Sequence, residues 1–161
     1  MDEGENLFFK ILRKLDDSHV LEQIVLIGSW VLPLYRKYLD DDRITVLRTS
    51  HIDFLVDRSS AIPNRYDVTQ MFSLLGFDVA WSVEGLNCKF VHPAMEVEFL
   101  TPELGKGEES TVQIEAFNIH AQPLRYLSLA LDYSIMLPYR DLLVRVPEPE
   151  VFLLLKLLII P

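Results

Sequence analysis

The sequence predicts an α/β (α+β) fold in which helices flank a mixed β-sheet, and three observations lead to this prediction. Short apolar segments of strand length alternate along the chain with longer segments of helical periodicity. One of the strand-like segments runs through a Gly-Ser pair directly into a helical segment. The 161 residues are 50% hydrophobic, which is enough for one domain with a substantial core.

The N-terminal part of the chain predicts a helix, a strand and a second helix. Residues 6–15 place apolar side chains at helical spacing, with basic residues on the other side. Residues 24–27 are four consecutive apolar residues, which is typical of a strand buried on both faces. After the turn at residues 28–29, residues 30–38 predict a helix, and Pro33 falls in its first turn, where a missing N–H costs little.

The remainder of the chain predicts a series of short strands with two interposed helices. The segments between residues 77 and 100 are extended and separated by glycine and proline, a pattern that predicts a hairpin or a meander. The predicted strands cover residues 52–56, 77–81, 87–92, 95–100, 111–114, 119–121, 135–137 and 142–146, and the predicted helices cover residues 66–75, with Gly76 as C-cap, and 124–131.

A last helix is predicted from Pro149 onward. Residues 151–160 are apolar on all sides except for Lys156, and such a helix belongs inside a core or an interface. We therefore expect residues 1–147 to form the main domain and residues 148–161 to begin a following helical segment of a longer natural protein. Docking of this helix on the core of the same chain, or contact between copies of the chain through it, are the alternatives.

Charge and cysteine content limit the classes of partner and compartment. The formal net charge of −9 argues against a domain that holds long nucleic acids by neutralising phosphates. The single cysteine, Cys88, excludes an intrachain disulfide framework and fits a reducing compartment. There is no apolar run of membrane-spanning length, and the first residues lack the basic region of a secretory signal. We expect a cytoplasmic protein without a membrane partner.

The Gly-Ser pair that follows the first strand is a candidate ligand site. Gly28 has no side chain, so a ligand or a neighbouring backbone can approach closely there. Ser29 lies where the N–H groups of the next helix have no partner, which is a favourable place for an anion such as a triphosphate.

Acidic residues on two of the predicted strands are candidate metal ligands. His51 and Asp53 are two residues apart, so their side chains share one face of a strand, with Cα atoms about 6.6 Å apart. By the same alternation, Glu96 and Glu98 share one face of a later strand. Carboxylates brought together in this way provide the hard oxygen ligands that Mg²⁺ prefers.

The order of these features resembles the nucleotidyltransferase superfamily of polymerase-beta type, and most closely its bacterial nucleotidyltransferase domains. The segments IVLIGSWVLPLYRKYL, TSHIDFLVD and MEVEFLTPELGKG carry the resemblance. The terminal segment VPEPEVFLLLKLLII is similar to the helix that follows the catalytic domain in such proteins.

The resemblance implies metal-dependent transfer of a nucleotidyl group from a nucleoside triphosphate to an unknown acceptor, with release of pyrophosphate. It implies Mg²⁺ or Mn²⁺ as cofactor, catalytic carboxylates at Asp53 and Glu98, and binding of the β and γ phosphates at Gly28 and Ser29. Lys106, in the Gly-Lys-Gly loop that follows the acidic strand, is a further candidate for phosphate binding. A plain surface turn is the alternative for this loop.

The sequence departs from the family pattern at His51, which stands where the family has the first acid of its paired-aspartate motif. Asp53 matches the second acid, and Glu98 is the best match to the third, with Glu96 as the alternative. The candidate metal ligands are therefore His51, Asp53, Glu98 and Glu96. Imidazole is a poor ligand for Mg²⁺ and a fair one for Mn²⁺ or Zn²⁺. Three alternatives follow: an altered metal set, a weak enzyme, or a non-catalytic domain that binds or regulates.

Overall fold

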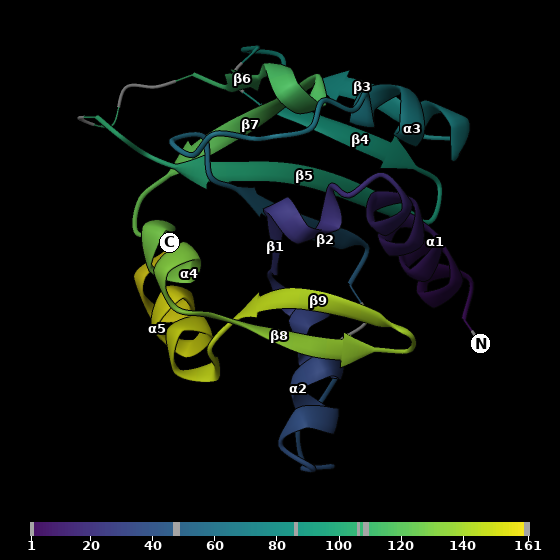
Figure 1. Ribbon diagram of the computed structural model, residues 1–161, viewed down its shortest axis with the longest axis vertical. Coiled ribbons are helices and arrows are strands. Elements are labelled where there is room, and N and C mark those ends of the chain that lie inside the picture. The colour runs from purple at the N-terminus through teal and green to yellow at the C-terminus, as the bar shows by residue number, and fades with distance from the viewer. Residues whose placement is uncertain (1, 47–48, 86, 106, 108–109, 160–161) are drawn as a thin grey trace.

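The computed structural model, shown in Figure 1, describes residues 2–46, 49–85, 87–105, 107 and 110–159. The helices are α1 (Glu3–Asp17), α2 (Leu32–Tyr38), α3 (Val68–Leu74), α4 (Ser128–Asp132) and α5 (Pro149–Ile159), with short 3-10 turns at Leu21–Gln23, Ser29–Val31 and Glu115–Phe117. The strands are β1 (Ile24–Ile27), β2 (His51–Val56), β3 (Asp78–Trp81), β4 (Cys88–His92), β5 (Met95–Pro102), β6 (Val112–Ile114), β7 (Ile119–Leu124), β8 (Ser134–Tyr139) and β9 (Leu142–Pro147).

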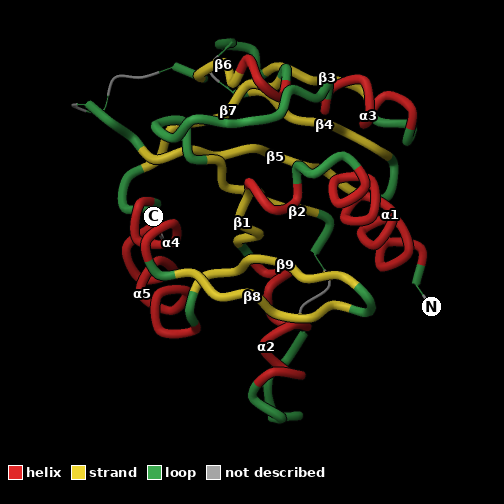
Figure 2. Tube along the Cα trace, viewed as in Figure 1, coloured by secondary structure: helices red, strands yellow, loops and turns green. Residues whose placement is uncertain are grey.

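A mixed sheet forms the centre of the fold, as the sequence predicts. Within the described residues its main path runs β1-β2-β5-β4-β3. Strands β2 and β5 are parallel. The other pairs on this path, β1 with β2, β4 with β5, and β3 with β4, are antiparallel. The predicted meander over β3, β4 and β5 is therefore confirmed. Strand β7 pairs in parallel with the end of β5, and β8 and β9 form a separate hairpin (Figure 2).

Both faces of β1 are buried, although this strand lies at the end of the main path of the sheet, and the burial explains its uninterrupted apolar sequence. All four residues of β1 are buried, and this confirms the prediction for residues 24–27. On one face the side chains of β1 and β2 pack into the main core, to which the buried face of α1 also contributes. On the other face they meet α4 and α5 in a smaller apolar cluster, formed by Val25, Ile27, Leu55, Leu100, Leu127, Ala130 and Leu155.

Two predicted helices differ from the observed elements. The helix predicted over residues 124–131 is wrong in its first half, because β7 continues through Pro123 to Leu124 and α4 begins only at Ser128. Pro123 is tolerated there because β7 pairs with only the last residues of β5, at the end of the sheet. The helix predicted over residues 30–38 begins as a 3-10 turn, and regular α-helix starts at Leu32.

Helix α5 confirms the helix predicted from Pro149, but most of its apolar surface is not covered in the described structure. Phe152 and Leu155 are buried, whereas Leu153 and Leu157 are 63% and 76% exposed. Phe152 packs edge-on against Tyr35 of α2, with ring centroids 5.5 Å apart. This contact fixes α5 against the domain, and the boundary placed after residue 147 stays a prediction. None of the described helices combines the length and apolar character needed to cross a membrane.

Candidate active site

The parallel pairing of β2 with β5 sets the candidate site residues opposite one another. Because side chains alternate between the two faces of a strand, every second pair lies on the same face of the sheet. Three such pairs succeed one another on the face that α4 and α5 partly cover. In chain order they are the ion-pair rung His51–Glu96, the carboxylate rung Asp53–Glu98 and the leucine rung Leu55–Leu100. The predicted sharing of a face by His51 and Asp53, and by Glu96 and Glu98, is confirmed.

Gly28 brings the turn after β1 directly against the carboxylate of Asp53. Its backbone has φ 76° and ψ −166°, a conformation that residues other than glycine rarely adopt. A Cβ atom at this position would lie 2.6 Å from Oδ2 of Asp53, which is too close for any other residue. The pairing of Ile27 with Asp53 fixes this proximity in the sheet register. The Gly-Ser turn and the carboxylate rung therefore form one site.

The carboxylate rung carries two acids that resist ionisation. Burial raises the pKa of Asp53, and the positive charges of His51, Lys156 and Lys89 partly offset that effect. Burial also raises the pKa of Glu98, and the adjacent charge of Asp53 raises it further. Within the described residues, Oε1 of Glu98 is buried and has no hydrogen-bond partner. A proton or a cation between these two carboxylates would relieve their repulsion.

The ion-pair rung is neutralised by its own contacts. Nδ1 of His51 lies 3.1 Å from Oε2 of Glu96, and Nζ of Lys89 lies 3.3 Å from the same oxygen. His51 therefore faces Glu96 across the two strands. The described ranges contain no group of three or more His, Cys, Asp or Glu side chains placed to hold a metal ion. The structure thus pairs Asp53 with Glu98 and His51 with Glu96, and the four-residue ligand set stays a prediction.

The hydroxyl group of Ser29 connects the glycine turn to the start of β2. Its Oγ lies 2.7 Å from Oγ1 of Thr49, and the indole N–H of Trp30 donates to the carbonyl oxygen of Thr49 at 3.2 Å. Ser29 is thus held at the start of β2, and phosphate binding there stays a prediction. The other candidate phosphate ligand, Lys106, lies outside the described residues.

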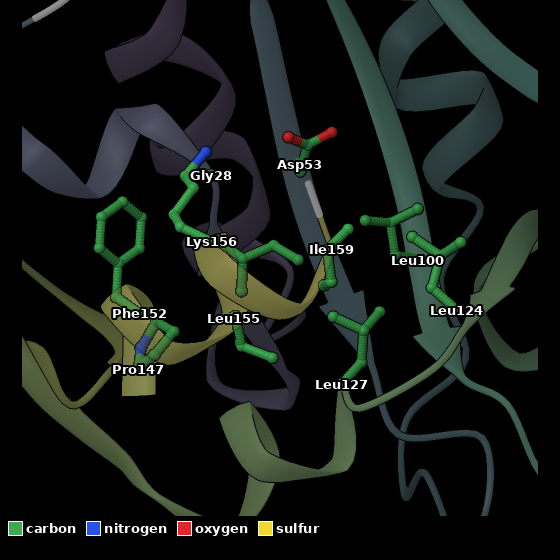
Figure 3. A pocket seen from close by; sticks show the side chains of 11 residues that line it. Gly28, Asp53, Leu100, Leu124, Leu127, Pro147, Phe152, Leu155, Lys156 and Ile159 are labelled. Atoms are coloured by element: carbon green, nitrogen blue, oxygen red, sulfur yellow. The ribbon is translucent and has the colours of Figure 1, made fainter. Parts of the chain in front are cut away.

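A cavity of about 250 Å³ opens beside Gly28 and Asp53, between the sheet and helix α5. Apolar side chains form most of its wall, and Asp53 and Lys156 are the charged residues among those that line it. Figure 3 shows Lys156 extending from α5 toward Gly28 and Asp53. The sequence prediction missed this residue as part of the site, although its position as the one charge among residues 151–160 was a usable signal.

The fold and the site together define a class of protein: an α+β domain whose adjacent parallel strands present paired carboxylates beside a Gly-Ser strand-to-helix turn, as in nucleotidyltransferase-like domains. Residues 6–161 match a family model described as Nucleotidyltransferase. The chain belongs to this family, and the resemblance predicted from its motifs is confirmed. Comparisons with curated proteins and with solved structures gave no significant match.

Proposed function

We propose that this domain transfers a nucleotidyl group from a nucleoside triphosphate to a hydroxyl group of an acceptor. The observation that carries the proposal is the pairing of two carboxylates on adjacent strands, Asp53 and Glu98, with Asp53 directly against Gly28 of the strand-to-helix turn. Membership of the nucleotidyltransferase family supports the reaction class. The acceptor, the identity of the nucleotide and the metal requirement belong to the proposal.

The residues of the carboxylate rung suit one divalent cation such as Mg²⁺ or Mn²⁺. Asp53 and Glu98 offer hard oxygen ligands, and Oε1 of Glu98 has no hydrogen-bond partner among the described residues. Mg²⁺ is commonly held by one or two carboxylates together with substrate phosphates and water, so two acids suffice. A bound cation would supply positive charge opposite the phosphates of the substrate.

The phosphates would lie at the turn, between the sheet and α5. Gly28 leaves room for them, Ser29 offers a hydroxyl group, and the ammonium group of Lys156 offers positive charge from the opposite wall of the cavity. The apolar remainder of the cavity accommodates the less polar part of a nucleotide. We assign Lys156 to phosphate binding for this reason.

In the proposed reaction, the oxygen of the acceptor hydroxyl group forms a bond to the α-phosphorus. The bond between that phosphorus and the oxygen bridging to the β-phosphorus breaks, and pyrophosphate leaves with the electron pair. The hydroxyl proton passes to a carboxylate and then to solvent.

Calorimetry and label transfer test the proposal together. We expect nucleoside triphosphates to bind in the presence of Mn²⁺, and label from the α-phosphate to appear in the protein, RNA or small-molecule fraction of a cell extract. Lys156→Met should weaken the binding of every triphosphate about tenfold or more, because a charged hydrogen bond to phosphate is lost. Lys10→Met on α1 is the matched control. Absence of triphosphate binding with either metal would overturn the proposal.

A non-catalytic binding domain is the second candidate function, and the ion-pair rung favours it. His51 stands where the resemblance of the sequence predicts a carboxylate, and its Nδ1 lies 3.1 Å from Oε2 of Glu96. Under this alternative the triphosphate binds with the same dependence on Lys156, but no label is transferred. Label transfer that requires Asp53 excludes this alternative.

A further inference from the structure

A second cavity adjoins the first at the end farther from the carboxylate rung. It has a volume of about 390 Å³ and shares Leu124 and Ile159 with the first cavity. Its remaining described lining includes Glu103, Arg125 and Tyr126. A ligand that enters beside Asp53 and follows the apolar wall therefore reaches a polar pocket with one acid and one base.

Glu103 is built into this pocket as a buried acceptor. Its side chain is 9% exposed, and its backbone N–H donates to the carbonyl oxygen of Leu124 at 3.0 Å. Oε2 lies 3.4 Å from Nε of Arg125, whereas Oε1 is buried and has no hydrogen-bond partner in the described structure. A buried carboxylate oxygen without a donor is costly. A ligand N–H group that reaches this oxygen would satisfy it.

Arg125 supplies the complementary group. Its side chain is 68% exposed, and its Nε lies 3.4 Å from Oε2 of Glu103. The guanidinium group carries five N–H donors, of which this contact uses one. A Cβ atom on Gly107 would lie 2.9 Å from Nη2 of Arg125 and 3.2 Å from Oε1 of Glu103. Gly107, with φ 85°, thus lets the backbone approach the pair without filling the space beside it. The pocket presents an acceptor next to donors.

The distance along β5 fits the length of a nucleotide. Glu103 follows Glu98 by five residues, or about 16 Å at the usual rise of an extended chain. If the phosphates lie at Gly28 and Lys156, as the proposed function requires, the sugar and base extend along the apolar cavity toward Glu103 and Arg125. The inference below rests on that function.

We propose that Glu103 and Arg125 read the edge of the nucleobase and select guanine. Guanine presents N–H donors at N1 and N2, which suit Oε1 of Glu103, beside an O6 acceptor, which suits the guanidinium group of Arg125. Adenine and cytosine place a ring nitrogen acceptor where guanine has its N1–H, so a lone pair would face the carboxylate. Uracil has a single donor on this edge. Glu103 and Arg125 are thus specificity-determining residues rather than catalytic ones.

Calorimetric titration of the chain with GTP, ATP, CTP and UTP, each with Mn²⁺, tests this proposal. We expect GTP to bind about tenfold more tightly than the other three, which is the effect of about one hydrogen bond to a charged group. Glu103→Gln should reduce that preference to about twofold, and Arg125→Gln should reduce it as well. Glu84→Gln, in an exposed turn, should leave it unchanged. Thermal unfolding of each variant confirms that the chain remains folded.

The outcomes separate this inference from the function on which it rests. Equal affinity for the four triphosphates, a preference for another base, or a GTP preference that survives Glu103→Gln would overturn the base assignment and leave nucleotide binding intact. Lys156→Met should weaken all four affinities by the same factor and preserve their order. Failure of the wild-type chain to bind any triphosphate would overturn both proposals.

Discussion

The carboxylate rung and the ion-pair rung are neighbours on the same two strands, yet they are electrostatic opposites. Asp53 and Glu98 are partly buried, their pKa values are raised, and one Glu98 oxygen has no partner among the described residues. In the neighbouring pair, Oε2 of Glu96 lies 3.1 Å from Nδ1 of His51 and 3.3 Å from Nζ of Lys89. The sheet thus presents the carboxylate rung, whose two acids have no positive group in close contact among the described residues. Beside it lies the ion-pair rung, whose acid already contacts His51 and Lys89.

The electrostatic difference between the two rungs originates in His51 and in the helices α4 and α5 that cover part of the sheet. Helices α4 and α5 cover the leucine rung, and their edge reaches the carboxylate rung, which gives Asp53 and Glu98 a partly apolar surrounding. The ion-pair rung lies beyond this cover, where the side chain of His51 is 57% exposed. An acid in place of His51 would extend the uncompensated negative charge of the carboxylate rung to the ion-pair rung. The comparison therefore places the main functional question at residue 51.

Removing the charge of Asp53 should have the largest effect. Asp53→Asn takes away the carboxylate nearest to Gly28, and we expect α-phosphate transfer to fall about 10²–10³-fold, as when one preorganised electrostatic group is lost from an active site. Initial rates of label transfer measure the loss. Asp78→Asn, on the exposed strand β3, is the matched control. A similar rate loss in both variants would show that the carboxylate rung has no special part in the reaction.

Replacing His51 should reduce the difference between the two rungs. In His51→Asp a third carboxylate joins Asp53 and Glu98, and we expect affinity for Mg²⁺ to rise about tenfold, because affinity for hard cations increases with the number of charged oxygen ligands. Calorimetry with Mg²⁺ and Mn²⁺ measures the change. His19→Asp, on an exposed loop, provides the same substitution away from the site. Unchanged Mg²⁺ affinity would mean that residue 51 does not reach the cation.

The sequence allowed much of the fold to be predicted, because the strongest signals are local. Strand β1 was predicted residue for residue, since its four buried apolar residues are bounded by a glycine that tolerates positive φ. The start of α4 was misplaced because proline usually ends a strand, and only the tertiary pairing of Pro123 with the end of β5 shows that this strand continues. Local propensity does not contain that information.

The site was predicted in part for the same reason. The alternation of side chains placed Asp53 and Glu98 on faces that could meet, and the parallel register then made them neighbours. The pairing of His51 with Glu96 depends on that register, which strand composition does not specify. Lys156 lines the same cavity as Asp53 but belongs to a helix far along the chain, and only the packing of α5 brings the two together.

The smallest expected effect is that of a Glu→Gln substitution on the free energy of unfolding, and its sign differs between the two rungs. The pKa of Glu98 is raised above its ordinary value of 4.5 in the folded chain, so the folded state retains a proton that the unfolded state loses. Stability therefore falls as pH rises from the ordinary pKa through the raised one. Glu98→Gln removes this dependence, and at pH 7.5 it should be more stable by about 1 kcal/mol, or about 2–4 °C in Tm.

Glu96→Gln is the matched substitution on the ion-pair rung. It removes the partner of His51 and Lys89, so its Tm at pH 7.5 should be equal to or slightly below that of the wild type, by up to about 1 kcal/mol. Thermal unfolding between pH 4 and pH 8 measures both variants. The gain in Glu98→Gln should shrink toward pH 4, where the wild-type carboxylate is protonated in both states. A loss of stability in Glu98→Gln at pH 7.5 would show that its carboxylate is already compensated, and the two rungs would then be electrostatically alike.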